Sequence, residues 1–175
     1  SIELIEKCGL KKNSVIFNAG AGTSKLINLL IKKGYENIII NDISSIALKK
    51  LQKELQNKPS IRFIQDDLTN PKKLSKINKV DLWHDRAVLH FFLEKYQQKN
   101  YFNLLKKVVK KNGHVILCEF NLSGAKKCCG LDIYNYDKKM LKEKLGEDFL
   151  LLKATNYTYE HPFNGNKREY IYTLF

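Results

Sequence analysis

Short apolar runs alternate along the chain with segments whose apolar residues recur at helical spacing. The runs that predict strands lie at about 14–19, 37–41, 61–64, 80–84 and 114–120. After the first run, Leu26, Ile27 and Leu30 form one apolar stripe, which predicts a helix over about 23–33. Further helices are predicted at 1–9, after a cap at Ser44 or Ser45, and at about 94–111 and 137–146. Strands that alternate with helices predict an α/β fold built on a parallel sheet.

The end of the chain has a different pattern. After a loop at 121–136 and the helix at 137–146, two β-like runs follow at about 149–158 and 167–175. A polar turn with proline and glycine joins them at 160–165. We therefore expect an antiparallel hairpin that closes the parallel sheet, and a single domain over residues 1–175.

The first predicted strand enters a turn that carries two glycines. Gly20 and Gly22 follow the apolar run Val15–Phe17, and the second apolar run ends on Asp42. Glycines at such a turn let the backbone approach a ligand closely, and a carboxylate at the tip of the next strand accepts both ribose hydroxyls. The pattern therefore predicts a site for a cofactor that contains adenosine.

Two departures separate this pattern from a dinucleotide-binding fold. Lys25 stands where those folds have a third glycine, which eases the packing of the helix on the strand. The terminal hairpin also replaces their parallel sixth strand. Both departures favour a cofactor without a pyrophosphate group.

Several further segments resemble those of a known family. They are the acidic residues after the second and third strands, W-H-D-R-A-V-L-H-F at 83–91, C-C-G-L at 128–131 and the turn from His161 to Gly165. In this order they resemble the class I S-adenosylmethionine-dependent methyltransferases, and more closely a group of small bacterial methyltransferases with a W-H-D-R-A-V-x-H-F segment. The resemblance covers nearly the whole chain. It implies S-adenosyl-L-methionine as cofactor and a Rossmann-like three-layer sandwich, with a mostly parallel seven-stranded sheet and a C-terminal antiparallel hairpin.

The resemblance also implies cofactor-binding residues at the first two strand ends. Asn18, Gly20 and Gly22 would hold the amino-acid part of the cofactor. Asp42 would accept the ribose hydroxyls, and its neighbour Ile43 would belong to the same site. Many family members carry aspartate or glutamate where this chain has Asn18. The segment before the first strand is short for the family, so we expect a helix or loop that often covers the cofactor to be missing from this sequence.

The next two strand ends complete the implied site. Asp67 and Leu68 would lie against the adenine, with Asp67 accepting from its exocyclic amine. His84, at the end of the fourth strand, would contact the cofactor and face the transferring methyl together with Asp85. The candidate catalytic residues are His84, Asp85, Arg86 and His90, and the candidate substrate-binding residues are Tyr134, Tyr136 and His161.

Some of these residues also have a purely structural interpretation. Arg86 and Asp85 could simply pair with each other, and His90 could pack as an ordinary polar residue. Trp83 is expected in the core.

The net charge of +13 raises the question of nucleic-acid binding. Only Arg62, Arg86 and Arg168 are arginines among the 31 basic residues, and arginine is the side chain best suited to forked contacts with phosphate and guanine. The lysines lie in helix-like segments away from the apolar stripes, so we interpret the charge as a solvated lysine coat. Nucleic acid stays open as an alternative partner.

No apolar run reaches the roughly 18 residues that a membrane span needs, and the start lacks a signal-peptide pattern, so we expect a cytoplasmic protein without a membrane partner.

The four cysteines do not predict a metal site. Cys8, Cys118, Cys128 and Cys129 form no zinc-ligand spacing with each other or with histidine. We expect reduced thiols, with binding of a soft metalloid or redox activity of the adjacent pair Cys128 and Cys129 as the alternative.

The resemblance implies a methyltransferase, and a small-molecule acceptor such as a thiol is favoured because the rim of the site is small and the chain carries no inserted substrate domain. One alternative is a protein-lysine or RNA methyltransferase, which the basic surface favours. Another is a non-catalytic cofactor-binding module, for which Asn18 and the short N-terminal segment argue.

Overall fold

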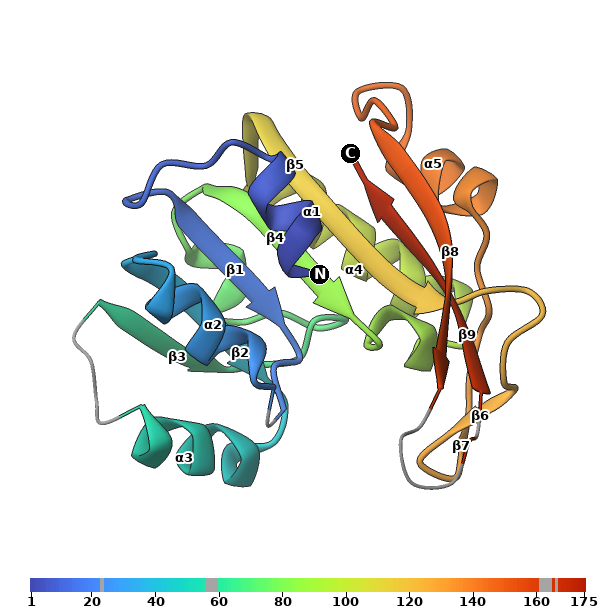
Figure 1. Cartoon of the computed structure of the whole chain (residues 1–175), viewed down its shortest axis with the longest axis horizontal. Coiled ribbons are helices and arrows are strands. Elements are labelled where there is room, and N and C mark those ends of the chain that lie inside the picture. Colours follow the sequence, from blue (N-terminus) through green and yellow to red (C-terminus); the bar gives the residue numbers. More distant parts are fainter. Residues whose placement is uncertain (23, 56–59, 161–164, 166) are drawn as a thin grey trace.

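A seven-stranded sheet in the order β3-β2-β1-β4-β5-β9-β8 organises the protein (Figure 1). The computed structural model describes residues 1–22, 24–55, 60–160, 165 and 167–175. The strands of this sheet are β1 (Val15–Ala19), β2 (Asn37–Asp42), β3 (Ile61–Gln65), β4 (Val80–Arg86), β5 (Val109–Phe120), β8 (Lys153–Glu160) and β9 (Lys167–Leu174). Strands β1 to β5 pair in parallel, and β9 runs antiparallel to both of its neighbours. The predicted fold class and the terminal hairpin are therefore confirmed.

Helices cover both faces of this sheet, which gives three layers (Figure 1). The helices are α1 (Ile2–Lys7), α2 (Leu26–Lys32), α3 (Ser45–Glu54), α4 (Lys95–Val108) and α5 (Lys138–Leu145), with 3₁₀ turns at Leu74–Lys76 and Leu89–Phe91. The first three helices pack on one face through an apolar cluster that includes Ile5, Ile27 and Leu51. Helices α4 and α5 pack on the other face through a second cluster. We call these the α1 face and the α4 face.

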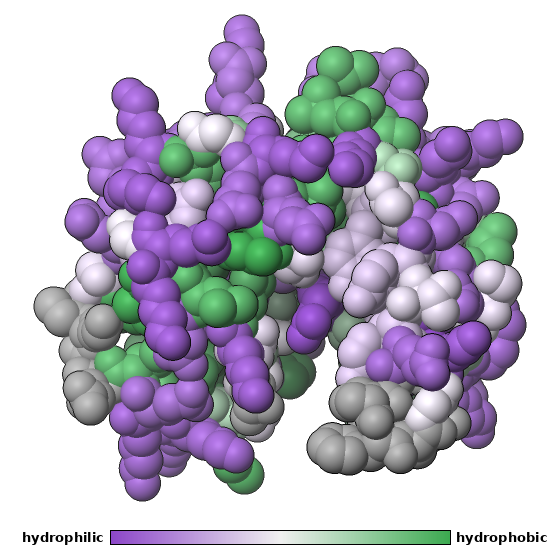
Figure 2. Space-filling model, in the orientation of Figure 1, coloured by the Kyte–Doolittle hydropathy of each residue, from purple (hydrophilic) through white to green (hydrophobic). Residues whose placement is uncertain are grey.

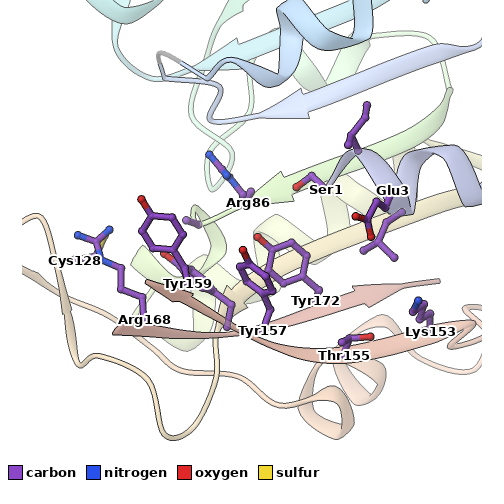
Figure 3. A pocket seen from close by; sticks show the side chains of 14 residues that line it. Ser1, Glu3, Arg86, Cys128, Lys153, Thr155, Tyr157, Tyr159, Arg168 and Tyr172 are labelled. Atoms are coloured by element: carbon purple, nitrogen blue, oxygen red, sulfur yellow. The ribbon is translucent and has the colours of Figure 1, made fainter. Parts of the chain in front are cut away.

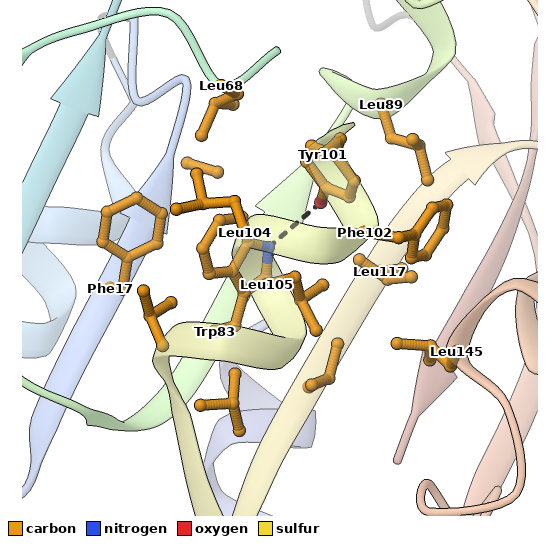
Figure 4. Close-up of a cluster of buried hydrophobic side chains, with 14 of the residues drawn as sticks. Phe17, Leu68, Trp83, Leu89, Tyr101, Phe102, Leu104, Leu105, Leu117 and Leu145 are labelled. Atoms are coloured by element: carbon orange, nitrogen blue, oxygen red, sulfur yellow. Dashed lines mark hydrogen bonds between the residues drawn. The ribbon is translucent and has the colours of Figure 1, made fainter. Parts of the chain in front are cut away.

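The cluster on the α4 face is centred on Trp83 of β4 (Figure 4). The Trp83 indole is fully buried, and its Nε1 donates a hydrogen bond of 3.0 Å to the hydroxyl of Tyr101. The two rings meet edge to face at 5.6 Å, and Phe17 lies against the indole at 4.3 Å. Burial of such large aromatic side chains is a major source of stability in a domain of this size. Trp83 thus belongs to the core, as expected.

The boundary between α4 and β5 differs from the prediction. The helix ends at Val108 and not at 111, and β5 begins at Val109 and not at 114. Two consecutive β-branched residues favour extended backbone, and Val109 pairs with Val80 of β4. The predicted turn at Asn112 therefore lies inside β5, where Asn112 has a φ of 62° and the register with β4 shifts.

The C-terminal part also holds one element that was not predicted. Within the expected loop 121–136, β6 (Lys127–Cys128) and β7 (Leu131–Asp132) form a two-stranded ribbon. The first strand of the hairpin starts at Lys153 and not at 149.

Hydrophilic side chains cover much of the face seen in Figure 2, and among the described residues no helix is long and apolar enough to cross a membrane.

Candidate active site

Two cavities adjoin each other where β1 and β4 end. The first, of about 590 Å³, lies beside the Gly20 turn between α1 and α2, and we call it the glycine-turn cavity. The second, of about 850 Å³, lies between α1 and the β8–β9 hairpin, and we call it the hairpin cavity. Ser1, Ile2 and Arg86 line both of them. In open α/β sheets ligands bind beyond the carboxyl ends of the strands, so both cavities lie where a ligand is expected.

The turn between β1 and α2 requires glycine at two positions, for different reasons. Gly20 and Gly22 have φ angles of 52° and 54°, in the left-handed region that side chains disfavour. A Cβ at Gly20 would overlap the side chain of Val88, whereas a Cβ at Gly22 would meet no atom within 4 Å. Gly20 is therefore needed for packing inside the protein, and Gly22 leaves open space beside the chain.

Asp42 ties the glycine turn to the end of β2. Its Oδ2 accepts a hydrogen bond of 2.7 Å from the backbone N–H of Gly22, and its Oδ1 accepts one of 2.8 Å from Ser44. Each carboxylate oxygen has a second lone pair, so two further donors can still be accepted. The following residue, Ile43, leaves a large apolar side chain 68% exposed beside this carboxylate.

The two aspartates after β3 have different partners. Oδ2 of Asp66 accepts from three backbone N–H groups at 72–74 and so caps the 3₁₀ turn there. Oδ1 of Asp67 accepts from the backbone and hydroxyl of Thr69. No hydrogen bond to Oδ2 of Asp67 is found among the described residues. Leu68 is buried in the cluster on the α4 face.

Asn18 and His84 lie side by side on β1 and β4, because the two residues are register partners. Both side chains are buried, and Asn18 Oδ1 and both ring nitrogens of His84 have no hydrogen-bond partner among the described residues. Burial lowers the pKa of His84 to about 3, so the ring is neutral at physiological pH. Buried polar atoms without partners are costly, and they mark a place where a ligand would supply the missing bonds.

Asp85 points to the opposite face of the sheet, into the core. Its side chain is fully buried, and Oδ2 accepts a hydrogen bond of 2.6 Å from the Tyr101 hydroxyl. Oδ1 accepts from the backbone of Val88 at 3.1 Å. Burial, with the carboxyl of Glu119 nearby, raises the pKa of Asp85 well above its usual value. In this structure Asp85 does not face either cavity, and its contacts orient the turn that follows β4.

Glu119 and His90 extend this buried group. Both are fully buried, and Nδ1 of His90 lies 2.9 Å from Oε2 of Glu119 without hydrogen-bond geometry. The same oxygen accepts from the backbone N–H of His90 at 3.2 Å. Burial raises the pKa of Glu119 to about 8 and lowers that of His90 to about 4, so at neutral pH the neutral forms of both are favoured. His90 thus lies in the core and not in a cavity.

The buried Glu119 carboxyl predicts that stability falls as the pH rises above neutrality. The folded protein holds this proton up to about pH 8, whereas an ordinary glutamate releases it near 4.5, so the stabilisation present at low pH is lost as the pH approaches 8. The buried histidines His84 and His90 make stability rise with pH, but only below about pH 6.5, where an unfolded histidine takes up a proton that the folded protein does not bind. Between pH 6.5 and 8 we expect the free energy of unfolding to fall by on the order of 2 kcal/mol.

Urea denaturation at a series of pH values measures this fall. Glu119→Gln should flatten it, because the amide cannot ionise and the neighbouring Asp85 loses a charge that raises its pKa. The exposed Glu147→Gln serves as the control and should keep the wild-type slope. An unchanged slope in Glu119→Gln would contradict the assignment.

Only part of the predicted catalytic and substrate-binding set reaches the cavities. Among the described residues, Arg86 lines both cavities, whereas His84, Asp85 and His90 line neither. Tyr134 is half-buried against the core of the α4 face, and Tyr136 is fully buried in it, so neither lines the hairpin cavity. The expectation that these two tyrosines face a substrate therefore does not agree with their positions. His161 lies outside the described residues.

Sequence reasoning missed the tyrosines that do line the hairpin cavity. They are Tyr157 and Tyr159 on β8 and Tyr170 and Tyr172 on β9. Each pair is spaced by two residues, so each pair points to one side of its strand. The two-residue spacing of tyrosines in both strands of the predicted hairpin could have indicated an aromatic surface on one side of it. Glu119, at the end of an apolar strand, was missed as well.

The cysteines show no sign of a metal site. All four are free thiols, and Sγ of Cys128 and Sγ of Cys129 lie 4.0 Å apart. No group of three or more histidine, cysteine or acidic residues that could hold a metal ion occurs in the described part of the chain.

Residues 10–170 match a protein family described as a methyltransferase domain. The chain belongs to this family. It is an S-adenosylmethionine-dependent methyltransferase, and S-adenosylmethionine is the methyl donor that the family implies. A search of curated protein sequences finds none that matches the methyltransferase.

Solved structures of other methyltransferases share the fold. An S-adenosylmethionine-dependent methyltransferase from Methanosarcina mazei has a TM-score of 0.78 at 16% identity, over 97% of this chain and 95% of its own. The 1,6-didemethyltoxoflavin-N1-methyltransferase of Burkholderia thailandensis has a TM-score of 0.71 at 16% identity, over 99% and 74%. The N-methyltransferase NodS of Bradyrhizobium japonicum has a TM-score of 0.74 at 11% identity, over 99% and 92%. At these identities the likeness concerns the fold.

The residues at the glycine turn suit S-adenosylmethionine. The amide oxygen of Asn18 is a buried acceptor without a partner in the described part of the chain, which matches the donor character of an ammonium group. Asp42 keeps lone pairs for two hydroxyls, and Gly22 leaves open space beside the backbone. The residues present can therefore bind the ammonium group and the ribose hydroxyls of the methyl donor.

Proposed function

We propose that this methyltransferase transfers a methyl group to a small-molecule acceptor bound in the hairpin cavity. The observation that carries the proposal is Arg86, which lines both the glycine-turn cavity and the hairpin cavity. A donor at the glycine turn and an acceptor beside the hairpin would therefore meet at this residue. The volume of about 850 Å³ lies within the range of small-molecule sites. One fold neighbour is, by its name, a methyltransferase for the small molecule 1,6-didemethyltoxoflavin, which supports the same class of acceptor.

We assign the cofactor-binding role to residues at the ends of β1, β2 and β3. Asn18 would hold the ammonium group, Asp42 the ribose hydroxyls and Asp67 the adenine amine. When bound, S-adenosylmethionine supplies an electrophilic methyl group on a sulfonium. The remaining task of the chain is to orient the acceptor and to exclude water.

The buried groups near this site are poorly suited to remove a proton from an acceptor. Burial lowers the pKa of His84 to about 3, so its ring is a weak base, and Asp85 points into the core and lines neither cavity. General-base catalysis works best with a pKa near the working pH. An acceptor that presents its own lone pair, such as a thiolate, suits these groups better than one whose proton must be removed. We therefore propose that Asp85 and His90 position the turn that carries Arg86.

The basic charge favours a second candidate, a methyltransferase for protein lysine or RNA. Incubation of the enzyme and methyl-labelled S-adenosylmethionine with a cell extract separates the two. We expect label in the small-molecule fraction after removal of protein and RNA. Label confined to protein or RNA would overturn the proposed acceptor class. Tight binding of the cofactor with no transfer to any fraction would support a non-catalytic module.

His84→Ala should lower turnover more than it lowers affinity for S-adenosylhomocysteine. The ring lies beside Asn18 under the glycine turn, and its removal leaves a cavity next to the proposed methyl position. Kinetics with a methyl acceptor found in the extract and calorimetry with S-adenosylhomocysteine measure the two effects. His114→Ala, at the far end of the parallel strands, is the control and should change neither. An equal loss of turnover and affinity would assign His84 to binding or structure alone.

A further inference from the structure

The hairpin cavity has an aromatic wall that the methyl-donor site does not use. Tyr157 and Tyr170 are register partners, and Tyr172 lies two residues further along β9. The ring of Tyr172 meets that of Tyr157 edge to face at 5.5 Å and that of Tyr170 at 6.2 Å. Tyr157 is still 50% exposed. Figure 3 shows Tyr157, Tyr159 and Tyr172 rising from the hairpin into the cavity, and Figure 2 shows side chains of intermediate hydropathy over this part of the surface. Tyrosine rings form a rigid wall with few rotatable bonds, suited to a flat apolar ligand.

Arginine is rare in this lysine-rich chain, yet it is concentrated in the lining of the hairpin cavity. Of the three arginines, Arg86 and Arg168 line it. Both are exposed, and among the described residues neither forms an ion pair. Arg168 lies two residues before Tyr170 on β9, so its side chain is on the same side of the strand as the aromatic wall. A guanidinium presents a fork of donors that matches a carboxylate, sulfonate or phosphate group.

The two ends of the cavity carry different charges. Arg86, Arg168 and Tyr159 lie at one end, and Glu3 and Lys153 lie at the other (Figure 3). Tyr159 is the sixth residue after Lys153 on β8, which places the two about 20 Å apart at the usual rise of a strand. The acidic side chain Glu3 offsets Lys153, whereas the arginine end has no acidic residue in the described lining. The unbalanced positive charge therefore lies at the end with Arg86 and Arg168, and Arg86 also lines the glycine-turn cavity.

We propose that the hairpin cavity recognises the methyl acceptor as a planar aromatic anion. The aromatic ring lies against the tyrosine wall, and the anionic group binds Arg168 and Arg86. This assignment rests on the proposed function, because it takes the occupant of the cavity to be the methyl acceptor. It explains why arginine and tyrosine converge in a chain whose remaining positive charge is carried almost entirely by lysine.

Calorimetry with three probes tests this recognition on protein saturated with S-adenosylhomocysteine. The probes are 2-naphthoate, its neutral counterpart 2-naphthamide, and cyclohexanecarboxylate, which keeps the charge without the aromatic ring. We expect 2-naphthoate to bind about tenfold or more tightly than either of the others. Equal affinity for all three, or no binding of 2-naphthoate, would overturn the inference.

Matched variants then locate the binding. Arg168→Met should abolish the preference for naphthoate over naphthamide, and Tyr157→Leu should abolish the preference for naphthoate over cyclohexanecarboxylate. Lys167→Met removes a neighbouring exposed cation that does not line the cavity, and it should keep both preferences. If Lys167→Met has the same effect as Arg168→Met, the preference reflects overall charge and the inference fails. Retained binding of S-adenosylhomocysteine shows that each variant is folded.

The extract experiment distinguishes failure of this inference from failure of the proposed function. Labelled small molecules that an anion exchanger retains support both. Labelled small molecules that pass through the exchanger overturn the anionic acceptor and leave the small-molecule function standing. Label found only in protein or RNA overturns both.

Discussion

Replacing Asp42 by alanine should weaken binding of S-adenosylhomocysteine by about tenfold to a hundredfold, the cost of leaving buried polar groups without an acceptor. Two ribose hydroxyls would lose their carboxylate, and the backbone N–H groups of Gly22 and Ser44 would lose their partner in the free protein. Calorimetric titration of the wild type and the variant measures the loss.

Asp42 both accepts from the backbone of the glycine turn and is proposed to bind the ribose, so a modified ligand is needed to separate the two roles. A 2′,3′-dideoxy analogue of S-adenosylhomocysteine lacks both hydroxyls, so its affinity should fall much less when Asp42 is replaced. Equal losses for the two ligands would mean that Asp42 only shapes the glycine turn. Unchanged affinity for S-adenosylhomocysteine would remove Asp42 from the site.

Gly20→Ala should destabilise the protein by about 2–5 kcal/mol, the sum of a left-handed backbone and an overpacked contact. The new methyl would overlap the side chain of Val88, which lies in the turn after β4. Gly22→Ala is a closely matched control, because its φ of 54° is nearly the same and its methyl would enter open space. We expect that variant to lose only about 1–2 kcal/mol.

Urea denaturation of both variants isolates the steric part as their difference. Equal destabilisation would show that the contact between Gly20 and Val88 is not tight in solution. Gly22→Ala should nevertheless weaken cofactor binding, because its methyl would occupy the space proposed for the donor.

The order and type of the main elements could be predicted from the sequence because local patterns determine them. The apolar run before Gly20 and the run that ends on Asp42 are short and bounded by turn residues, and both form parallel strands. The boundary at Val109 could not be predicted from the Asn112-Gly113 signal. Its strand conformation depends on pairing with Val80, which is distant in the sequence.

The orientation of individual site residues was harder to predict, because it depends on which helix covers which face. His84 and Asp85 are neighbours in the sequence, yet β-strand alternation sends His84 to the α1 face and Asp85 to the α4 face. The choice between them required the position of Tyr101 on α4. Glu119 could not be paired with His90 from the sequence, since 29 residues separate them and both lie among apolar residues. A binding role for the tyrosines of the hairpin could not be predicted from the sequence, because it depends on the cavity that forms between the hairpin and α1.

A crystal structure of the methyltransferase with S-adenosylhomocysteine would test the central claim most directly. We expect the ribose hydroxyls within hydrogen-bond distance of Asp42, the ammonium group at Asn18, and the sulfur directed past Arg86 into the hairpin cavity. A cofactor bound away from Asp42, or a sulfur that faces away from the hairpin cavity, would contradict the assignment of the two cavities.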